Sequence, residues 1–283
     1  MKNWLFATAF SLTIIFSSCG EKSSEEISDN VTVESTKDTT PVTVNEETKF
    51  KFDFAIANIP SPVGNINEFS SWGVDYDNSF LVDTKKQLSS STEFSKALAL
   101  GVYNIDMSYA MVNNKSEDVL KYLKSVVVSA ESLGLKSAVD QMVGKRAEKN
   151  LGNKDSLLQI LDEIFVKSDS YLRTHARVYT AASVLAGSWV ESLDLTCKLT
   201  ENANDAAIKE KGYKNLWDQR FYLKNLTDLL NDYKDKKECV TLNDELKKIH
   251  SEIDAIKDPK DLKESNFKSI SEKLYKLRAS IIK

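Results

Sequence analysis

Apolar residues recur every three or four positions along most of the chain, which is the spacing of one face of an α-helix. The pattern predicts helices over the following stretches: 65–73, 91–112, 116–134, 138–149 and one that begins after an N-cap at Asn153 or Asp155. Paired asparagines or a glycine close the second and third of these stretches, as is typical of helix C-termini.

The segment from Tyr179 to Leu199 is apolar on nearly every side before Glu191. Small residues alternate there with large ones, including Trp189. A helix without a polar face is buried on all sides in a globular protein. We therefore expect this helix to lie at the centre of the fold.

The last third of the chain carries narrow apolar stripes flanked by Lys and Glu. Leucines and isoleucines recur with steps of three and four over 223–233, 242–256 and 267–281, and Asp258-Pro259 separates the last two stripes. Such stripes are typical of antiparallel helical hairpins. The sequence thus predicts an all-α, irregular multi-helix bundle, with an α-solenoid-like array as the alternative.

One short stretch has a different period. Phe50, Phe52, Phe54 and Ile56 alternate with smaller or charged residues. A period of two is typical of extended backbone. The sequence therefore predicts a short extended N-terminal segment that lies against the helical body.

The N-terminus carries a targeting signal. Lys2 precedes an apolar run, from Leu5 to Phe16, that is too short to cross a bilayer as a helix. The run ends in Phe16-Ser17-Ser18-Cys19, which resembles a bacterial lipobox. The resemblance implies acylation of the Cys19 thiol, cleavage before it, and a stable anchor of two or more acyl chains.

Charge divides the chain unevenly. The formal net charge is −4, yet residues 20–49 carry eight acids against three lysines, and acids and bases are equal in number over 50–283. The predicted organisation is a signal peptide (1–18), a lipidated Cys with a disordered acidic tether (19–49), a main helical domain (50–200) and a C-terminal helical bundle packed on it (201–283). A neutral body gives no electrostatic basis for binding nucleic acid.

No stretch matches a nucleophile elbow, a phosphate-binding glycine loop, a dinucleotide fingerprint or a metal-ligand spacing, so no cofactor or metal is predicted. The candidate site is instead a set of polar residues within apolar helices: Asp106, Tyr109, Trp189 and Glu191. Carboxylates are rarely buried unpaired. The two interpretations are a buried hydrogen-bonded network that fixes helix register and a small inter-helix polar pocket.

Two cysteines remain after Cys19. Cys197 continues the buried stripe of the central helix, and Cys239 lies at the start of a later one. Outside the cytoplasm they could pair, but the sequence does not supply the Cα separation that a disulfide requires. Free thiols and a Cys197–Cys239 disulfide are both open at this point.

The stretches "IANIPSPVGN", "ALGVYNIDMSYA", "NKDSLL" and "AGSWVESLDL" resemble a family of Bacteroidota lipoproteins that has no assigned activity. The resemblance implies an envelope location and a helical body, and it carries over no catalytic residue. Gly20 after the lipobox favours the outer membrane. The acidic run that follows resembles the surface-export signal of these bacteria, so the cell surface is favoured slightly over the periplasmic face.

Three functions are compatible with these features. The first is a membrane-anchored binding or scaffolding accessory with an envelope protein as partner. The second is a small-ligand-binding protein or hydrolase with a pocket at Asp106 and Glu191. The third is a structural envelope protein. An enzyme is the less favoured class because no catalytic motif supports one.

Overall fold

A computed structural model describes residues 46–58, 71–85, 91–135 and 177–283, together with isolated positions between them. These residues belong to one compact unit, Val42–Lys283. Within them the chain forms helices and no strand, so the predicted all-α multi-helix bundle is confirmed. The helices are α1 (Glu46–Asn58), α3 (Glu93–Val112), α4 (Ser116–Ser132), α7 (Val178–Asn202), α8 (Ala206–Leu230), α9 (Lys237–Asp254) and α10 (Glu264–Ile281).

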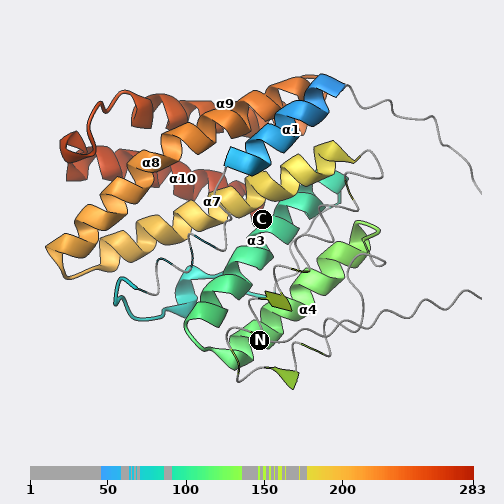
Figure 1. Cartoon of the computed structure of the whole chain (residues 1–283), viewed down its shortest axis with the longest axis horizontal. Coiled ribbons are helices and arrows are strands. Elements are labelled where there is room, and N and C mark those ends of the chain that lie inside the picture. The colour runs from blue at the N-terminus through green and yellow to red at the C-terminus, as the bar shows by residue number, and fades with distance from the viewer. Residues whose placement is uncertain are drawn as a thin grey trace, which may run out of the picture. The chain divides into compact units, whose positions relative to one another are not determined.

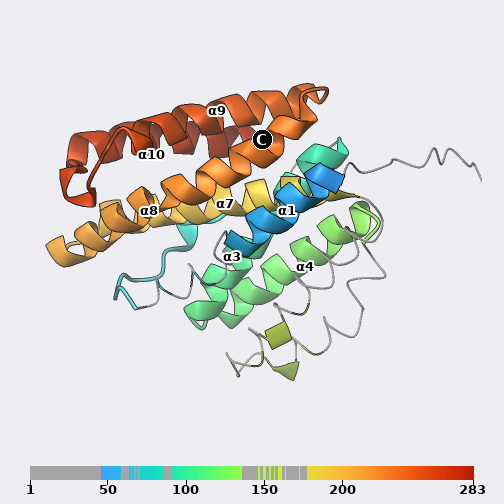
Figure 2. The same ribbon diagram turned by 45° about the horizontal axis from the view of Figure 1, so that its top comes forward.

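Helix α7 lies at the centre, as its sequence predicts. It packs against α3 on one side and against α8 and α10 on the other, and α4 lies beside α3 (Figures 1 and 2). Nearly every α7 side chain is buried, including the large residues Trp189, Leu193 and Leu195. Its partners cover it on several sides, which explains why its sequence lacks a polar face.

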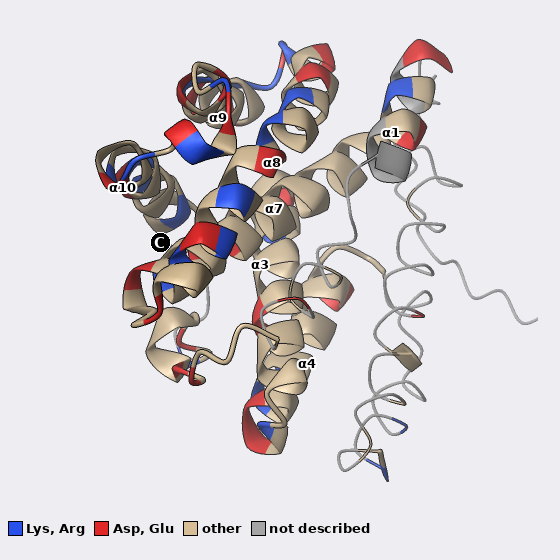
Figure 3. Cartoon of the chain, turned by 60° about the vertical axis from the view of Figure 1, so that its left-hand side comes forward, with Lys and Arg blue, Asp and Glu red and all other residues tan. Residues whose placement is uncertain are grey.

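The C-terminal hairpins also follow the sequence pattern. Short 3₁₀ turns, η2 (Asn231–Tyr233) and η3 (Pro259–Asp261), join α8 to α9 and α9 to α10. Asp258 caps η3 by accepting the Lys260 N–H at 2.9 Å, and Pro259 follows it directly. Along these helices blue and red residues intermix on the outer turns (Figure 3), in keeping with a body of balanced charge.

The N-terminal segment is the clear correction. The predicted extended stretch at 50–56 is part of helix α1, which begins at Glu46, inside the predicted tether. Phe52 is buried, whereas Phe50 and Phe54 lie one turn apart on the exposed side, with ring centroids 6.5 Å apart. Lys51 ties the helix to η2 through Asp232, at 2.9 Å. The alternation in the sequence comes from one buried and two exposed aromatic residues on a helix. The contacts between α1 and α8 decide the backbone conformation.

The other predicted helix boundaries can be compared with the structure only in part. Helix α4 begins at Ser116, where the predicted stretch 116–134 begins, and Lys115 is its N-cap. Asn153 accepts the Ser156 N–H at 3.0 Å, as an N-cap does. The remainder of the predicted helices over 65–73, 138–149 and beyond Asp155 falls largely outside the described residues. So do the signal peptide, Cys19 and the tether up to residue 45, and the boundary at residue 200 stays a prediction.

Two glycines allow α3 and α7 to approach closely. A Cβ at Gly101 would collide with the backbone of Val184 and Ser188, and one at Gly187 would collide with the backbone of Leu98. The Ser188 hydroxyl donates to the Gly101 carbonyl at 3.2 Å across the same crossing. Backbone packs on backbone here, so neither side can yield by rotating a side chain.

We expect Gly187→Ala to lower the free energy of unfolding by about 1–3 kcal/mol, because the added methyl group forces the two helix backbones apart. The better helix propensity of Ala opposes this by up to about 1 kcal/mol. Urea denaturation followed by circular dichroism measures the difference.

Gly212→Ala tests a second close contact, between α8 and α7. Its added methyl group meets the side chain of Thr200, including a Cβ that rotation of the side chain does not move, so we expect a loss of stability there as well. A Gly187→Ala variant as stable as the wild type would show that the α3–α7 crossing is not limited by backbone contact.

Candidate functional site

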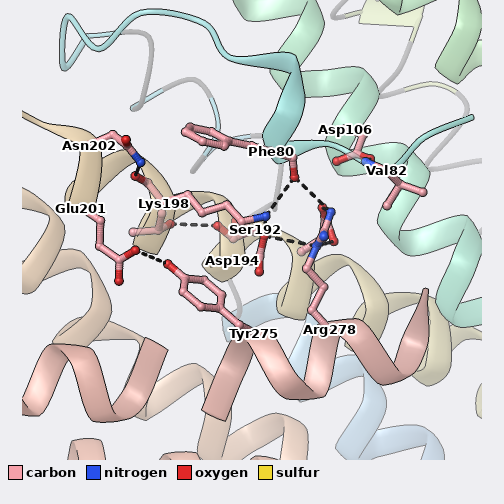
Figure 4. Close-up of polar contacts among 12 residues, drawn as sticks. Phe80, Val82, Asp106, Ser192, Asp194, Lys198, Glu201, Asn202, Tyr275 and Arg278 are labelled. Carbon is pink, nitrogen blue, oxygen red and sulfur yellow. Dashed lines mark hydrogen bonds and ion pairs between the residues drawn. The ribbon is translucent and has the colours of Figure 1, made fainter. Parts of the chain in front are cut away.

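Five ionisable side chains gather where α3, α7 and α10 meet; four of them are buried, and Lys198 is partly exposed (Figure 4). Arg278 of α10 holds Glu191 of α7 with two hydrogen bonds, at 2.7 Å from Nε and 2.6 Å from Nη2. Its Nε also lies 3.2 Å from an oxygen of Asp194, and Lys198 reaches the same oxygen at 2.6 Å. Asp106 of α3 completes the group. We call these five residues the charged network.

The network also holds a piece of main chain, the segment Tyr76–Val82 that includes the 3₁₀ turn η1 (Asn78–Phe80). The Phe80 carbonyl accepts hydrogen bonds from Lys198 Nζ and Arg278 Nη2, each at 3.1 Å (Figure 4). Hydrogen bonds from two cations to one carbonyl oxygen are charge-assisted and therefore strong. They fasten the segment to α7 and α10.

Two residues further on, the same segment is held from the other side. The Val82 N–H donates to Asp106 at 2.9 Å, and the Tyr122 hydroxyl of α4 donates to the Val82 carbonyl at 2.8 Å. Tyr76 adds a hydrogen bond to Asp118 of α4 at 2.9 Å. The segment is thus tied to four helices, mostly through its peptide groups.

Helical periodicity explains the local arrangement. Glu191, Asp194 and Lys198 follow one another by three and four residues, so all three project from one face of α7. Arg278 lies one turn after Leu274 on the apolar stripe of α10 and faces α7 with the rest of that stripe. The sequence therefore places these charges on the buried faces of both helices.

The charge balance of the network requires a proton. Asp106, Glu191 and Asp194 are three carboxyl groups, and Lys198 and Arg278 are two cations. One oxygen of Asp106 has no hydrogen-bond donor in the described part of the chain, although it neighbours Glu191. Burial and Glu191 raise the pKa of Asp106 well above its usual range. Asp106 therefore favours its protonated form.

Asp194 is shifted in the same direction. Burial and the charge of Glu191 raise the pKa of its carboxyl group to about 7, against the opposing pull of Arg278 and Lys198. On Arg278 the two carboxylates outweigh burial and raise its pKa, so the guanidinium stays charged. The network thus combines two cations with two carboxyl groups, Asp106 and Asp194, whose pKa values are raised.

Two of the four residues proposed from the sequence, Asp106 and Glu191, come together here. Tyr109 lies apart: its ring stacks on Tyr76 at 5.1 Å, and its hydroxyl accepts the Asp77 N–H at 3.5 Å. Burial raises the pKa of Tyr109 to about 12. Tyr109 therefore supports the Tyr76–Val82 segment rather than the charges.

Trp189 is also buried on α7, and its indole N–H has no hydrogen-bond partner among the described residues. No described contact joins it to the charged network. Of the two sequence interpretations, the arrangement around Asp106 and Glu191 corresponds to a buried network across helices, and each carboxyl group is at most 1% exposed.

Sequence reasoning missed Asp194, Lys198 and Arg278. A signal was present, because an Asp and a Lys four residues apart within the most apolar helix imply a buried ion pair. Arg278 had a weaker signal: a cation on the apolar stripe of α10. The contacts with Phe80 and Val82 involve peptide groups, which leave no trace in the sequence.

Both later cysteines are free and buried, so no disulfide joins them. Burial raises the pKa of the Cys197 thiol and raises that of Cys239 to about 11. The Cys239 thiol donates to the Leu230 carbonyl at 3.7 Å. Unreactive thiols of this kind act as small apolar residues in the core.

Comparison of the chain with protein-family models, with curated proteins and with solved structures gave no match. Among the described helices, none is long and apolar enough to cross a membrane. Nor do the described residues include a group of three or more His, Cys, Asp or Glu side chains placed to hold a metal ion.

We expect Arg278→Met to lower the free energy of unfolding by about 3–5 kcal/mol, because it leaves buried carboxylates without their main cation. Adding Glu191→Gln to this variant should restore part of the loss, since it removes one of those charges. Guanidinium denaturation of the two single variants and the double variant gives the coupling energy. Additive losses would show that the pair is not energetically coupled.

The raised carboxyl pKa values predict that stability falls as pH rises. Between about pH 6 and about pH 8, ordinary Asp and Glu side chains are ionised in both states. Asp106 and Asp194 keep protons in the folded state that they lose in the unfolded state, so the free energy of unfolding decreases across this range. Thermal melting at both pH values measures the change.

Asp106→Asn should weaken this pH dependence, because the amide stays neutral. The matched control is Asp218→Asn, which removes a carboxylate from an exposed ion pair with Lys214 and should leave the pH dependence intact. A wild-type protein that is more stable at the higher pH would contradict the proton assignment.

Proposed function

We propose that this chain is a lipid-anchored accessory protein of the bacterial outer envelope whose helical body binds another envelope protein. The lipobox-like Phe16-Ser17-Ser18-Cys19 and the acidic stretch after it support the anchor and the tether. The resemblance to Bacteroidota lipoproteins supports the outer membrane, with the cell surface slightly favoured.

The observation that carries the binding role is the contrast between interior and surface. In the described interior, the charged side chains form ion pairs with one another and hydrogen bonds to the main chain. Large aromatic side chains stand on the outside instead: Phe50 is 69% exposed, Phe54 51% and Phe221 59%. Exposed aromatic residues are typical of protein-binding surfaces.

A small-ligand-binding protein or hydrolase is the second candidate. It is favoured by the raised pKa of Asp106 and by the Ser192 hydroxyl, which is buried and has no hydrogen-bond partner among the described residues. Perturbed carboxyl groups are common in active sites. The complete burial of Asp106 and Glu191 counts against it, since a substrate would have to displace the Tyr76–Val82 segment to reach them.

Cross-linking in intact cells tests the first proposal. We expect the full chain to cross-link reproducibly to an envelope protein and to incorporate fatty acid. Cys19→Ala should abolish the lipid labelling and weaken the cross-links, because the anchor confines the protein near its partner. Labelling that survives Cys19→Ala would contradict the anchor, and a wild-type protein without a reproducible partner would contradict the binding role.

A further inference from the structure

Helix α8 carries an ordered stack of three side chains on its surface. The Arg220 guanidinium lies 3.1 Å from the ring centroid of Trp217 and 3.9 Å from that of Phe221. Trp217 and Arg220 are partly buried, and Phe221 is exposed. We call these three residues the Arg220 stack.

Two hydrogen bonds fix the stack in place. The Trp217 indole N–H donates to the Ile256 carbonyl at the end of α9, at 2.8 Å, and Arg220 Nη1 donates to the Trp217 carbonyl at 2.9 Å. A side chain held in this way loses little conformational freedom when it binds a partner. The guanidinium is therefore pre-organised.

Arg220 differs from two lysines of this helix in having no carboxylate partner among the described residues. Lys214 pairs with Asp218, and Lys224 pairs with Asp228, both at 2.6 Å and both at the i, i+4 spacing. Arg220 has no carboxylate partner among the described residues, and one of its N–H groups donates to the Trp217 carbonyl. A guanidinium fork with free N–H groups is matched by a carboxylate, which it can bind with two parallel hydrogen bonds.

Phe221 adds an apolar surface beside this cation. Arg and aromatic residues together dominate the binding energy of protein interfaces, most of all where an apolar contact shields a charge pair from water. The chemistry of the surface is thus one cation and one exposed ring side by side.

We propose that the Arg220 stack is the docking site for a partner protein and that it binds an Asp or Glu side chain flanked by apolar residues. This inference rests on the proposed binding function and names the chemistry of its partner. The carboxylate pairs with the Arg220 guanidinium, and a neighbouring apolar side chain covers Phe221.

A peptide titration tests the chemistry. The probes are the capped peptides Ac-Ser-Leu-Glu-Leu-Ser-NH2 and Ac-Ser-Leu-Gln-Leu-Ser-NH2, added to the isotope-labelled full chain in detergent micelles. We expect the Glu peptide to shift the Arg220 Nε–H and Trp217 indole resonances and to bind about tenfold more tightly than the Gln peptide, as one charge-assisted pair would give. Equal binding of the two peptides, or no shift at Arg220, would overturn the proposal.

Three variants make the result specific. Arg220→Gln should reduce the Glu peptide to the affinity of the Gln peptide, and Phe221→Ala should weaken both peptides. Lys224→Gln removes a cation from the same helix and should leave the affinities unchanged. Melting temperatures confirm that each variant is folded. If Lys224→Gln lowers the affinity for the Glu peptide as much as Arg220→Gln does, the effect comes from the overall charge of the surface and the proposal fails.

Cellular cross-linking separates this inference from the function on which it rests. If Arg220→Gln removes the envelope cross-links of the wild-type chain, the stack is the docking site. If those cross-links persist, the partner binds elsewhere, and this inference fails while the binding function stands. If the wild-type chain gives no cross-links at all, the binding function itself fails.

Discussion

The buried pair of Arg278 and Glu191 is the interaction on which the arrangement of the helices most depends. It joins α10 to α7 across 87 residues of sequence through two short hydrogen bonds. Burying two ions is costly, and the attraction between them offsets that cost only when the geometry is good. A register shift of either helix would separate the two groups and leave charges without partners in the core. We infer that the pair serves mainly to make one packing arrangement distinct from its competitors.

The same charges organise backbone that lies outside the α-helices. Segment Tyr76–Val82 contributes a carbonyl and an N–H to the network, so its peptide groups are satisfied by side chains instead of by a helix or sheet. Buried peptide groups require such partners. Along α3 and α7, Asp106 and Glu191 follow the close crossing at Gly101 and Gly187 by five and four residues. Helix packing and the charged network thus support each other.

These features separate the interior from the surface in functional terms. The raised pKa values of Asp106 and Asp194 make the stability of the core sensitive to pH. We propose that binding takes place on the outside, where exposed aromatic side chains lie on α1 and α8 and Arg220 lies on α8. The proposed anchor would favour such binding, because confinement at a membrane raises the effective concentration of even a weakly bound partner.

The sequence by itself determined the helical class, the central place of α7, the C-terminal hairpins and the burial of Asp106 and Glu191, because hydrophobic periodicity directly reports which faces are buried. Only the tertiary structure decided that Phe50 to Ile56 is helical, since an alternation of three aromatics fits a strand as well as a helix, and packing against α8 resolves the choice. It also decided the partners of the buried acids. Lys198 and Arg278 are remote from Asp106 in sequence, and the peptide groups of Phe80 and Val82 are common to every residue type. Ion pairs and main-chain contacts between distant segments depend on how the helices pack, and that information is spread over the whole chain.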